Sequence, residues 1–466
     1  MKKRAMAVAA MLAACNTAPP ELLPPPFGPE GPQPPRLFFP TGLAKAPDGA
    51  LLVANGNFNH EFDSGTVVSL KSTYLADLFT AGRDCDRADA DPACTAPIPS
   101  DQFAGAVMIG NFAGPLVLTD DGTTAFTGSR DSGILNAVGV EPGGVLHCPP
   151  GTGNDATHDC RKGLNVDLLA AGVDGPFSIV PGTTFIPGTA TPKPVFFISS
   201  VIPHIDSISG SLINTSTAVG VLDMQPPWPL LYSMRAGSSL LSVAGGSGVG
   251  PMVFDSIRRQ LYLGGCYVRS AALGNGQPGS APCSGVTTNY LRILNVDSAN
   301  ATDPIVLDLY ADVLSITTVQ LLLGDPDPVT QAPTTLWATM RAPDSLVRIE
   351  LPTLPSVGLR VREIIPLPIA PADMVRIARP GAPDLLAVVA EKQNTVAIVD
   401  TATDEVVTLV RRLGDSPFII KEVDCPIAGS ACLVTSVFGA CRIGLIEVPR
   451  SQPEQAKLRA LAGSCP

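Results

Sequence analysis

The sequence predicts an all-β protein in which one unit of several short strands is repeated along the chain. Short runs rich in β-branched residues recur from Pro40 to the end, and small polar turns separate them. The 466 residues include 44 Gly and 47 Pro without a collagen period, which is typical of turns between many short strands. A repeat array can fill this length as one domain, so we expect a single folded body over residues 39–466.

The clearest unit lies within residues 385–420. Three strand-like runs, Leu385–Ala390, Thr395–Asp400 and 405–412, are followed by a Gly-Asp-Ser-Pro turn and a fourth apolar run. The run NTVAIVDTATDEVV, with the Gly-Asp-Ser-Pro-Phe step after it, closely resembles one blade of a YVTN-type β-propeller. That resemblance implies blades of four antiparallel strands, a to d, counted outward from the axis of a ring.

The same plan accounts for about seven blades. Most innermost strands are expected to begin at a proline, whose missing N–H does no harm at the start of a strand. The expected starts are Pro40, Pro115, Pro176, Pro251, Val319 (the one without a proline), Pro371 and Pro417. We therefore predict an all-β β-propeller of about seven four-stranded blades, with a pair of β-sandwiches as the alternative fold.

Two further features concern the turns and the chain end. Asp48-Gly49 and Asp121-Gly122 are expected to form hairpin turns between strands a and b. The run 457–463 is expected to be the outermost strand of the last blade, so that the chain ends where the ring meets its first blade. Ring closure would leave few free strand edges.

The N-terminus indicates export. Lys2, Lys3 and Arg4 precede an apolar run that is too short to span a bilayer as a helix, which is a secretory signal pattern. The run ends in Leu-Ala-Ala-Cys15 and resembles the lipobox of bacterial lipoproteins. That family implies a signal peptide over residues 1–14, acyl chains (palmitate among them) on Cys15, and attachment to the cell envelope, in the outer membrane. An ordinary signal peptide with a chance cysteine is the alternative.

Residues 15–38 form a linker dominated by proline. Such a segment favours the extended polyproline form, at about 3.1 Å per residue, and could hold the folded body up to roughly 60 Å from the bilayer. A recognition motif for a proline-binding domain is the alternative.

The cysteines are odd in number, and lipid on Cys15 would leave ten of the eleven. An oxidising envelope allows disulfides between neighbours in the chain. The expected pairs are Cys85–Cys94, Cys148–Cys160, Cys266–Cys283, Cys425–Cys432 and Cys441–Cys465. Spacing alone does not fix this connectivity. The last pair is expected at the seam where the ring closes, and the first in a c–d insertion away from the seam.

Composition excludes some partners. The formal net charge is −11, and no basic patch of the kind that binds nucleic acid is visible. We expect no nucleic-acid partner, no binding of anionic lipid headgroups by the folded body, and a monomer.

Metal sites have weak signals in this sequence. The acidic run that starts at Asp84 suits calcium only in part, because its spacing misses the EF-hand pattern; a solvated loop is the alternative. His147 and His158 suggest zinc, but they stand beside cysteines that an exported protein would more often oxidise to a disulfide. We predict no cofactor, with Ca²⁺ left open, and we find no motif that assembles catalytic residues.

Polar residues gather in the expected b–c loops, which share one face of a propeller with the d–a loops. Loops on a rigid scaffold are where binding usually resides, although ordinary solvated turns are the plain alternative. The candidates for one rim of the central channel are Asn55, Asn57, His60, Arg130, Asp131, His204, Arg341, Asp344, Glu391 and Lys392.

Two functions from different classes remain. The first is a lipid-anchored envelope module that binds a protein, a peptide or a glycan. The second is a lactonase-like hydrolase with a metal in the central channel, for which Glu61, Asp131, His204 and Asp344 are the candidate ligands. The fold alone does not decide between them, because propellers host many functions.

Overall fold

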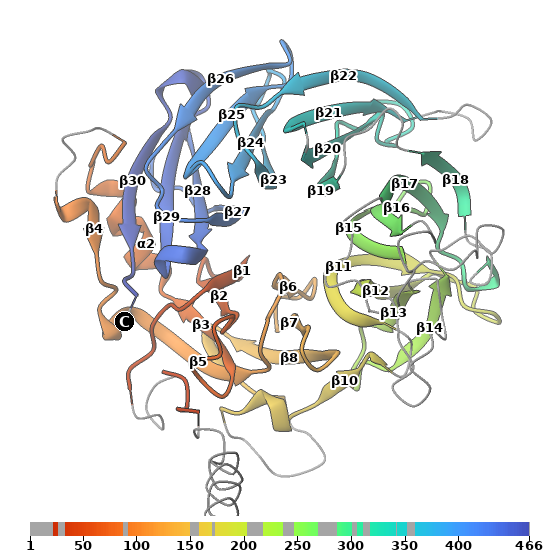
Figure 1. Cartoon of the computed structure of the whole chain (residues 1–466), viewed down its shortest axis with the longest axis horizontal. Helices are drawn as coiled ribbons and strands as arrows, with labels where there is room; N and C mark the ends of the chain where they lie inside the picture. Colours follow the sequence, from red (N-terminus) through yellow and green to blue (C-terminus); the bar gives the residue numbers. More distant parts are fainter. Residues whose placement is uncertain are drawn as a thin grey trace, which may run out of the picture.

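The structure, a computed structural model, describes most of the chain between residues 22 and 465. The described residues are 22–26, 33–86, 92–149, 158–169, 173–202, 218–235, 247–268, 287–300, 305–310, 317–341, 343–351 and 359–465. They form seven antiparallel sheets arranged as blades around one axis, which confirms the predicted seven-bladed β-propeller (Figure 1). Cys15, His204 and Cys283 lie outside these residues, so the lipid attachment, the place of His204 and the Cys266–Cys283 pair stay predictions.

The blades follow one another in chain order, and within each blade the first strand lies nearest the ring axis and the last strand lies farthest from it. Blade 1 contains β1 (Pro40–Lys45), β2 (Leu51–Asn55), β3 (Gly65–Leu70) and β5 (Phe103–Ile109). Blade 2 contains β6 (Val117–Leu118), β7 (Thr124–Ser129), β8 (Ile134–Glu141) and β10 (Asn165–Asp167), with β9 (Val145–His147) also paired to β8. Blade 3 contains β11 (Asp174–Thr184), β12 (Lys193–Ile202), β13 (Ala218–Asp223) and β14 (Leu230–Arg235).

The remaining four blades have the same plan. Blade 4 contains β15 (Ser247–Asp255), β16 (Gln260–Val268), β17 (Thr287–Asn295) and β18 (Ile305–Tyr310). Blade 5 contains β19 (Thr317–Leu323), β20 (Thr335–Arg341), β21 (Ser345–Glu350) and β22 (Arg360–Pro366). Blade 6 contains β23 (Pro371–Ile377), β24 (Leu385–Ala390), β25 (Thr395–Asp400) and β26 (Glu405–Val410). Blade 7 contains β27 (Pro417–Val423), β28 (Ser430–Val437), β29 (Arg442–Pro449) and β30 (Lys457–Ala462).

The hydrophobic core is divided into layers between neighbouring blades. Seven clusters of buried apolar side chains each lie between two adjacent sheets. Strands b and c are therefore covered on both faces, and β24, with the sequence LLAVVA, is buried at every position. The outermost β22, with the sequence RVREIIP, is largely exposed and correspondingly polar. This burial explains why the b and c strands are apolar without alternation.

Three predicted blade starts, Pro40, Pro371 and Pro417, are the first residues of their strands, and a β-bulge follows each. The other four innermost strands begin two to four residues from the predicted start, at Val117, Asp174, Ser247 and Thr317. The register of the innermost strand shifts directly after Pro40, Pro371 and Pro417. A bulge releases the proline from the hydrogen-bond ladder, which it cannot serve as a donor. Gly49 and Gly122 have φ of 86° and 69°, as the predicted hairpin turns require.

Blade 1 carries a long insertion, residues 71–102, between β3 and β5. This insertion, the strap, contains helix α2 (Ser72–Thr80), the Cys85–Cys94 disulfide and strand β4 (Thr95–Ala96). Strand β4 pairs in parallel with β30 of blade 7 and lies beside it at the outer edge of the ring (Figure 1). Blade 7 is built from the last four blade strands of the chain, so the strap joins the two ends of the propeller.

The strap packs closely against blade 7. Leu75 and Phe79 of α2 are buried in the core between blades 7 and 1. The backbone N–H of Cys85 donates to the Leu458 carbonyl at 2.8 Å, and both Cys85 and Cys94 belong to the core between blades 6 and 7. The disulfide thus lies on the side of blade 7 that faces blade 6, and it is the strap around it that reaches across the seam. The insertion is long enough to cross the outer edge of blade 7.

Four of the predicted disulfides are present: Cys85–Cys94, Cys148–Cys160, Cys425–Cys432 and Cys441–Cys465. The last one joins the β28–β29 loop to the segment after β30, which confirms that b–c loops and strand-d ends share a face. The remaining short helical turns are 3₁₀ helices at Pro92–Cys94, Ser100–Gln102, Cys160–Lys162, Ser298–Asn300, Phe438–Ala440 and Pro453–Gln455. No helix in the described part of the chain is long and apolar enough to cross a bilayer.

Part of the proline-rich segment lies on the propeller. The N–H of Asp63 donates to the Leu23 carbonyl at 2.9 Å, and Leu37 and Phe38 are fully buried. These described pieces are held by blade 1 and do not act as a free spacer.

Candidate functional site

Two of the predicted rim residues maintain the fold of blade 1. Asn55 is buried; its amide group donates to the Thr66 hydroxyl at 2.8 Å, and its carbonyl accepts the N–H of Phe38 at 3.0 Å. Asn57 is also buried and closes its loop through the backbone of Phe62, at 2.7 and 3.2 Å. Both amides are satisfied within the protein, so neither is available to a ligand.

Two other rim candidates pair with each other. The guanidinium of Arg341, at the end of β20, forms an ion pair with Glu391, which follows β24 in the next blade. The Arg341 Nε also donates to the Pro371 carbonyl at 2.9 Å. The structure thus brings these two residues together as a clasp between blades 5 and 6. The backbone carbonyl of Asp344 accepts the N–H of Leu367. Lys392, which follows Glu391 in the chain, is exposed.

Arg130 differs from these residues because no carboxylate of the described residues pairs with its charge. It directly follows β7, and its guanidinium lies over the Phe177 ring, 4.7 Å from the centroid. Its Nε is buried without an acceptor, and among the described residues no carboxylate pairs with it. The surrounding protein removes water from the cation, and this burial lowers the pKa of Arg130 to about 10. The neighbouring Asp131 is exposed.

Sequence reasoning missed a row of aromatic side chains beside Arg130. In this aromatic row, Phe39 contacts Phe438 at 5.1 Å, Phe438 contacts Phe58 at 5.2 Å, and Phe58 contacts Phe112 at 4.9 Å between ring centroids. All four rings are half-buried. The row extends from the β28–β29 loop of blade 7 over blade 1 to the β5–β6 connection that leads into blade 2, where the Phe112 carbonyl accepts the N–H of Arg130 at 3.4 Å.

The predicted candidate His60 lies at the end of this row. Its ring contacts Phe112 edge-on at 4.8 Å, and its side chain is exposed. A sequence signal for the row did exist: Gly-Asn-Phe occurs both at Gly56 and at Gly110, each time in a loop at the same face. A Cβ at Gly56 would lie 2.3 Å from the Phe58 ring, so the glycine makes room for that ring.

The backbone beneath the aromatic row is strained. Phe39 and Phe112 have φ of 48° and 51°, in the left-handed region that bulky residues rarely occupy. Each such residue costs on the order of 1–3 kcal/mol, and residues of this kind concentrate at functional sites. The protein therefore holds these two rings in place against a local cost.

The metal alternatives find no support in the described residues. The Asp86 carboxylate accepts the N–H of Arg411 at 2.8 Å, and burial raises its pKa. Cys148 beside His147 is bound to Cys160 in a disulfide. No three His, Cys, Asp or Glu side chains of the described part are grouped closely enough to hold a metal ion.

The three described ligands suggested for a hydrolase are likewise not grouped into a metal site. Glu61, Asp131 and Asp344 lie in the b–c loops of blades 1, 2 and 5, and His204 is outside the described residues. What the described part of this face does offer is a cation without a partner beside half-buried aromatic rings. That combination suits binding of an anionic group with an apolar neighbour.

Comparison with known proteins shows the fold. No protein-family model and no curated protein matches the chain. The β-propeller domain of Cps50 (Swd1) from Myceliophteria thermophila is 11% identical, with a TM-score of 0.52, over 90% of this chain and 99% of that chain. Kuenenia stuttgartiensis hydrazine synthase is 12% identical, with a TM-score of 0.54, over 90% of this chain and 98% of that chain. The chain is thus a β-propeller, and the YVTN-type repeat and the lipobox stay predictions.

Proposed function

We propose that the protein is a monomeric, lipid-anchored binding module of the bacterial cell envelope. Its partner is a peptide segment that carries a carboxylate next to apolar or aromatic side chains. The signal peptide and the lipobox at Cys15 support the anchor, and the proline-rich segment supports a body held near a membrane surface. The propeller fold supports an interaction role, because its loops sit on a rigid scaffold.

The unpaired Arg130 is the observation that carries the proposal. Many other arginines of the described part pair with carboxylates, for example Arg341 with Glu391 and Arg379 with Asp400 at 2.9 Å. Arg36 also has a buried Nε without a partner and lies over the Phe62 ring, but Arg130 is the one of the two that stands beside the aromatic row. A desolvated guanidinium without a counter-ion destabilises the fold, so its presence favours a function. A carboxylate matches its planar donors in a bidentate way.

The aromatic row indicates the shape of the partner. Its rings adjoin one another from blade 7 over blade 1 to the connection into blade 2, as an extended chain with apolar side chains would require, and the backbone of Arg130 contacts Phe112 at one end. Aromatic side chains and arginine are the residues that dominate most protein interfaces energetically. We therefore place the carboxylate of the peptide at Arg130 and its apolar side chains along the row.

Peptide selection tests this binding. A random-peptide library is selected on the full-length protein and, in parallel, on Arg130→Met. We expect the native protein to enrich peptides with Asp or Glu beside aromatic residues, and Arg130→Met to lose the acidic preference. Arg341→Met combined with Glu391→Gln, which removes a paired arginine on the same face, should leave the preference unchanged. Peptides without an acidic preference, or an unchanged preference in Arg130→Met, would contradict the proposal.

The stability of Arg130→Met separates a functional from a structural arginine. Burial lowers the folded-state pKa of Arg130 from 12.5 to about 10. At pH values below about 10 the side chain is charged in the folded and in the unfolded protein, and burying that charge costs the fold free energy. The shift corresponds to roughly 3 kcal/mol at most, less the stacking on Phe177. We expect Arg130→Met to unfold at the same or a higher denaturant concentration at pH 7. A clear loss of stability would show that the arginine serves the fold.

The anchor has its own test. Cys15→Ser should move the protein from the membrane fraction to the soluble envelope or the medium, because the acyl chains would then have no attachment point. Fractionation after a high-salt wash, followed by immunoblotting, measures this. A variant that stays in the membrane fraction would place the anchor elsewhere.

A further inference from the structure

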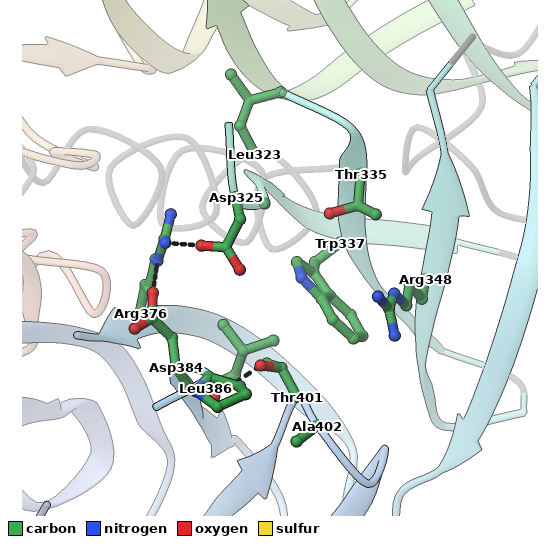
Figure 2. Close-up of a pocket in the computed structure, with 12 residues that line it drawn as sticks. Leu323, Asp325, Thr335, Trp337, Arg348, Arg376, Asp384, Leu386, Thr401 and Ala402 are labelled. Carbon is green, nitrogen blue, oxygen red and sulfur yellow. Dashed lines mark hydrogen bonds and ion pairs between the residues drawn. The ribbon is translucent and has the colours of Figure 1, made fainter. Parts of the chain in front are cut away.

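A pocket lies between blades 5 and 6, on the face of the ring opposite to Arg130 and the aromatic row. Its volume is about 410 Å³, and it is lined by the a–b loops of both blades and by the β25–β26 turn. Figure 2 shows Trp337 between two polar groups, with Arg348 on one side and Arg376 with its carboxylates on the other. A volume of this size falls in the range of small-molecule sites, at about 300–1,000 Å³.

The charges of the pocket do not favour an anion. Arg376 is held by two carboxylates, Asp384 through Nε and Asp325 through Nη2 (Figure 2). Arg348 pairs with Asp404 at 3.2 Å. The charged residues that line the pocket are thus two arginines and two aspartates, which carry no net charge, and Asp404 neutralises Arg348 from outside the lining.

Several hydrogen-bonding groups remain open in the pocket. Trp337 is 4% exposed and lines the pocket, and its indole N–H donates to no acceptor in the described part of the chain. Arg348 uses Nη1 for Asp404 while its side chain stays 32% exposed, so its Nη2 is open to solvent. Asp325 is 62% exposed and retains acceptor capacity beside its bond to Arg376. The hydroxyl of Thr335 can both donate and accept.

We propose that this pocket binds one neutral sugar residue, either free or at the end of a glycan. A pyranose fits the volume, and its neighbouring hydroxyls both donate and accept hydrogen bonds. The indole N–H and Arg348 donate to sugar oxygens, and Asp325 accepts from hydroxyl groups. This site is separate from the peptide site at Arg130, because the two lie on opposite faces of the ring.

The rigidity of the pocket supports this assignment. Arg376 is fixed by carboxylates from two blades, and the Arg348 guanidinium lies 5.4 Å from the Trp337 ring centroid. Thr401 donates its hydroxyl to the Asp384 carbonyl at 2.7 Å, which holds the floor of the pocket (Figure 2). Polar groups that are already oriented lose little entropy when a ligand binds.

Titration with defined sugars tests the proposal. The full-length protein is titrated with a panel of neutral hexoses, N-acetylhexosamines, uronic acids and amino sugars, by calorimetry and saturation-transfer NMR. We expect saturable binding of at least one neutral sugar, and at least tenfold weaker binding of the matching uronic acid. If no neutral sugar binds saturably, or if only charged sugars bind, the proposal is wrong.

Two variants locate the binding. Trp337→Phe keeps the apolar ring and removes the N–H, so we expect affinity to fall roughly fivefold to tenfold, as for one lost hydrogen bond. Asp325→Asn changes an exposed loop residue without emptying the core and should weaken binding to a similar extent. Arg130→Met on the opposite face is the matched control and should bind sugar like the native protein. Unchanged affinity in both pocket variants would place the sugar elsewhere and overturn the assignment.

Discussion

The closure seam between blades 7 and 1 and the junction between blades 5 and 6 are held together in different ways. At the seam the fastening lies at the outer edge, where strap strand β4 pairs with β30 and the Cys85–Cys94 disulfide packs on blade 7. At the junction it lies near the axis, where Gln320 of β19 donates to Asp373 of β23 at 2.7 Å. The Arg341–Glu391 ion pair adds a clasp at the loop face.

The difference reflects the path of the chain. Blades 5 and 6 are consecutive in sequence, so the connection from β22 to β23 keeps them together, and moderate polar contacts suffice. No direct chain connection links blade 7 to blade 1, and chain ends fray readily. The strap, a long insertion of blade 1, crosses the seam and holds the two blades together in place of such a connection. The junction, in contrast, leaves room for a pocket at its other face.

The largest effect is expected from the strap disulfide. Cys85→Ser with Cys94→Ser should lower the free energy of unfolding by about 2–4 kcal/mol, because it frees the loop that packs on blade 7 and buries two hydroxyl groups. Thermal unfolding without reductant measures this loss.

Cys441→Ser with Cys465→Ser is the matched comparison for that experiment. Its disulfide closes a longer loop, with a sequence separation of 24 against 9, so loop entropy alone would rank it first. We expect the strap variant to lose more, because its cysteines are 3% and 6% exposed and sit in a core layer. A larger loss in the 441/465 variant would show that the strap is not the main fastening.

These contrasts also explain what the sequence could and could not predict. The blade starts were predictable because proline and Asp-Gly act locally on the backbone. The disulfides were predictable because their partners are neighbours in the chain. The strap was not: β4 is only Thr95–Ala96, and its pairing depends on a strand more than 300 residues away, with Leu461 opposite Thr95. No local pattern records such a contact.

The candidate site was only partly predictable, for a related reason. Arg130 and Arg341 follow equivalent strands and are alike as sequence features. Arg341 finds Glu391, 50 residues further along the chain, while Arg130 finds a phenylalanine ring. Whether a charge is paired is a property of the assembled ring and cannot be read from the loop that carries it.

A medium-sized effect is expected at Asp373, the centre of the inner fastening. Its carboxylate accepts Gln320 Nε2 and, at 2.9 Å, the N–H of Ile420 in blade 7. Burial nevertheless raises its pKa above the ordinary value of 3.8. Between 3.8 and the raised pKa the folded protein binds more protons than the unfolded chain, so stability falls as pH rises through that window.

Asp373→Asn removes this titration. The unfolding free energy of the variant, minus that of the native protein, should therefore increase with pH from about 4 upward and then level off. Urea unfolding at a series of pH values measures the difference. A flat difference for Asp373→Asn would mean that its hydrogen bonds hold the carboxylate ionised despite its burial.

The smallest effect is expected from the ion pair of the junction. Arg341 and Glu391 are each about one-third exposed, 32% and 33%, so water screens their attraction. A double-mutant cycle with Arg341→Met and Glu391→Gln should give a coupling energy of no more than about 1 kcal/mol. The Nε bond of Arg341 to the Pro371 carbonyl is lost in both variants that lack the arginine and so cancels in the cycle. A coupling of several kcal/mol would show that the Arg341–Glu391 pair at the loop face is the main contact that holds blades 5 and 6 together. The junction would then not be held mainly near the axis, and the contrast with the strap at the outer edge would fail.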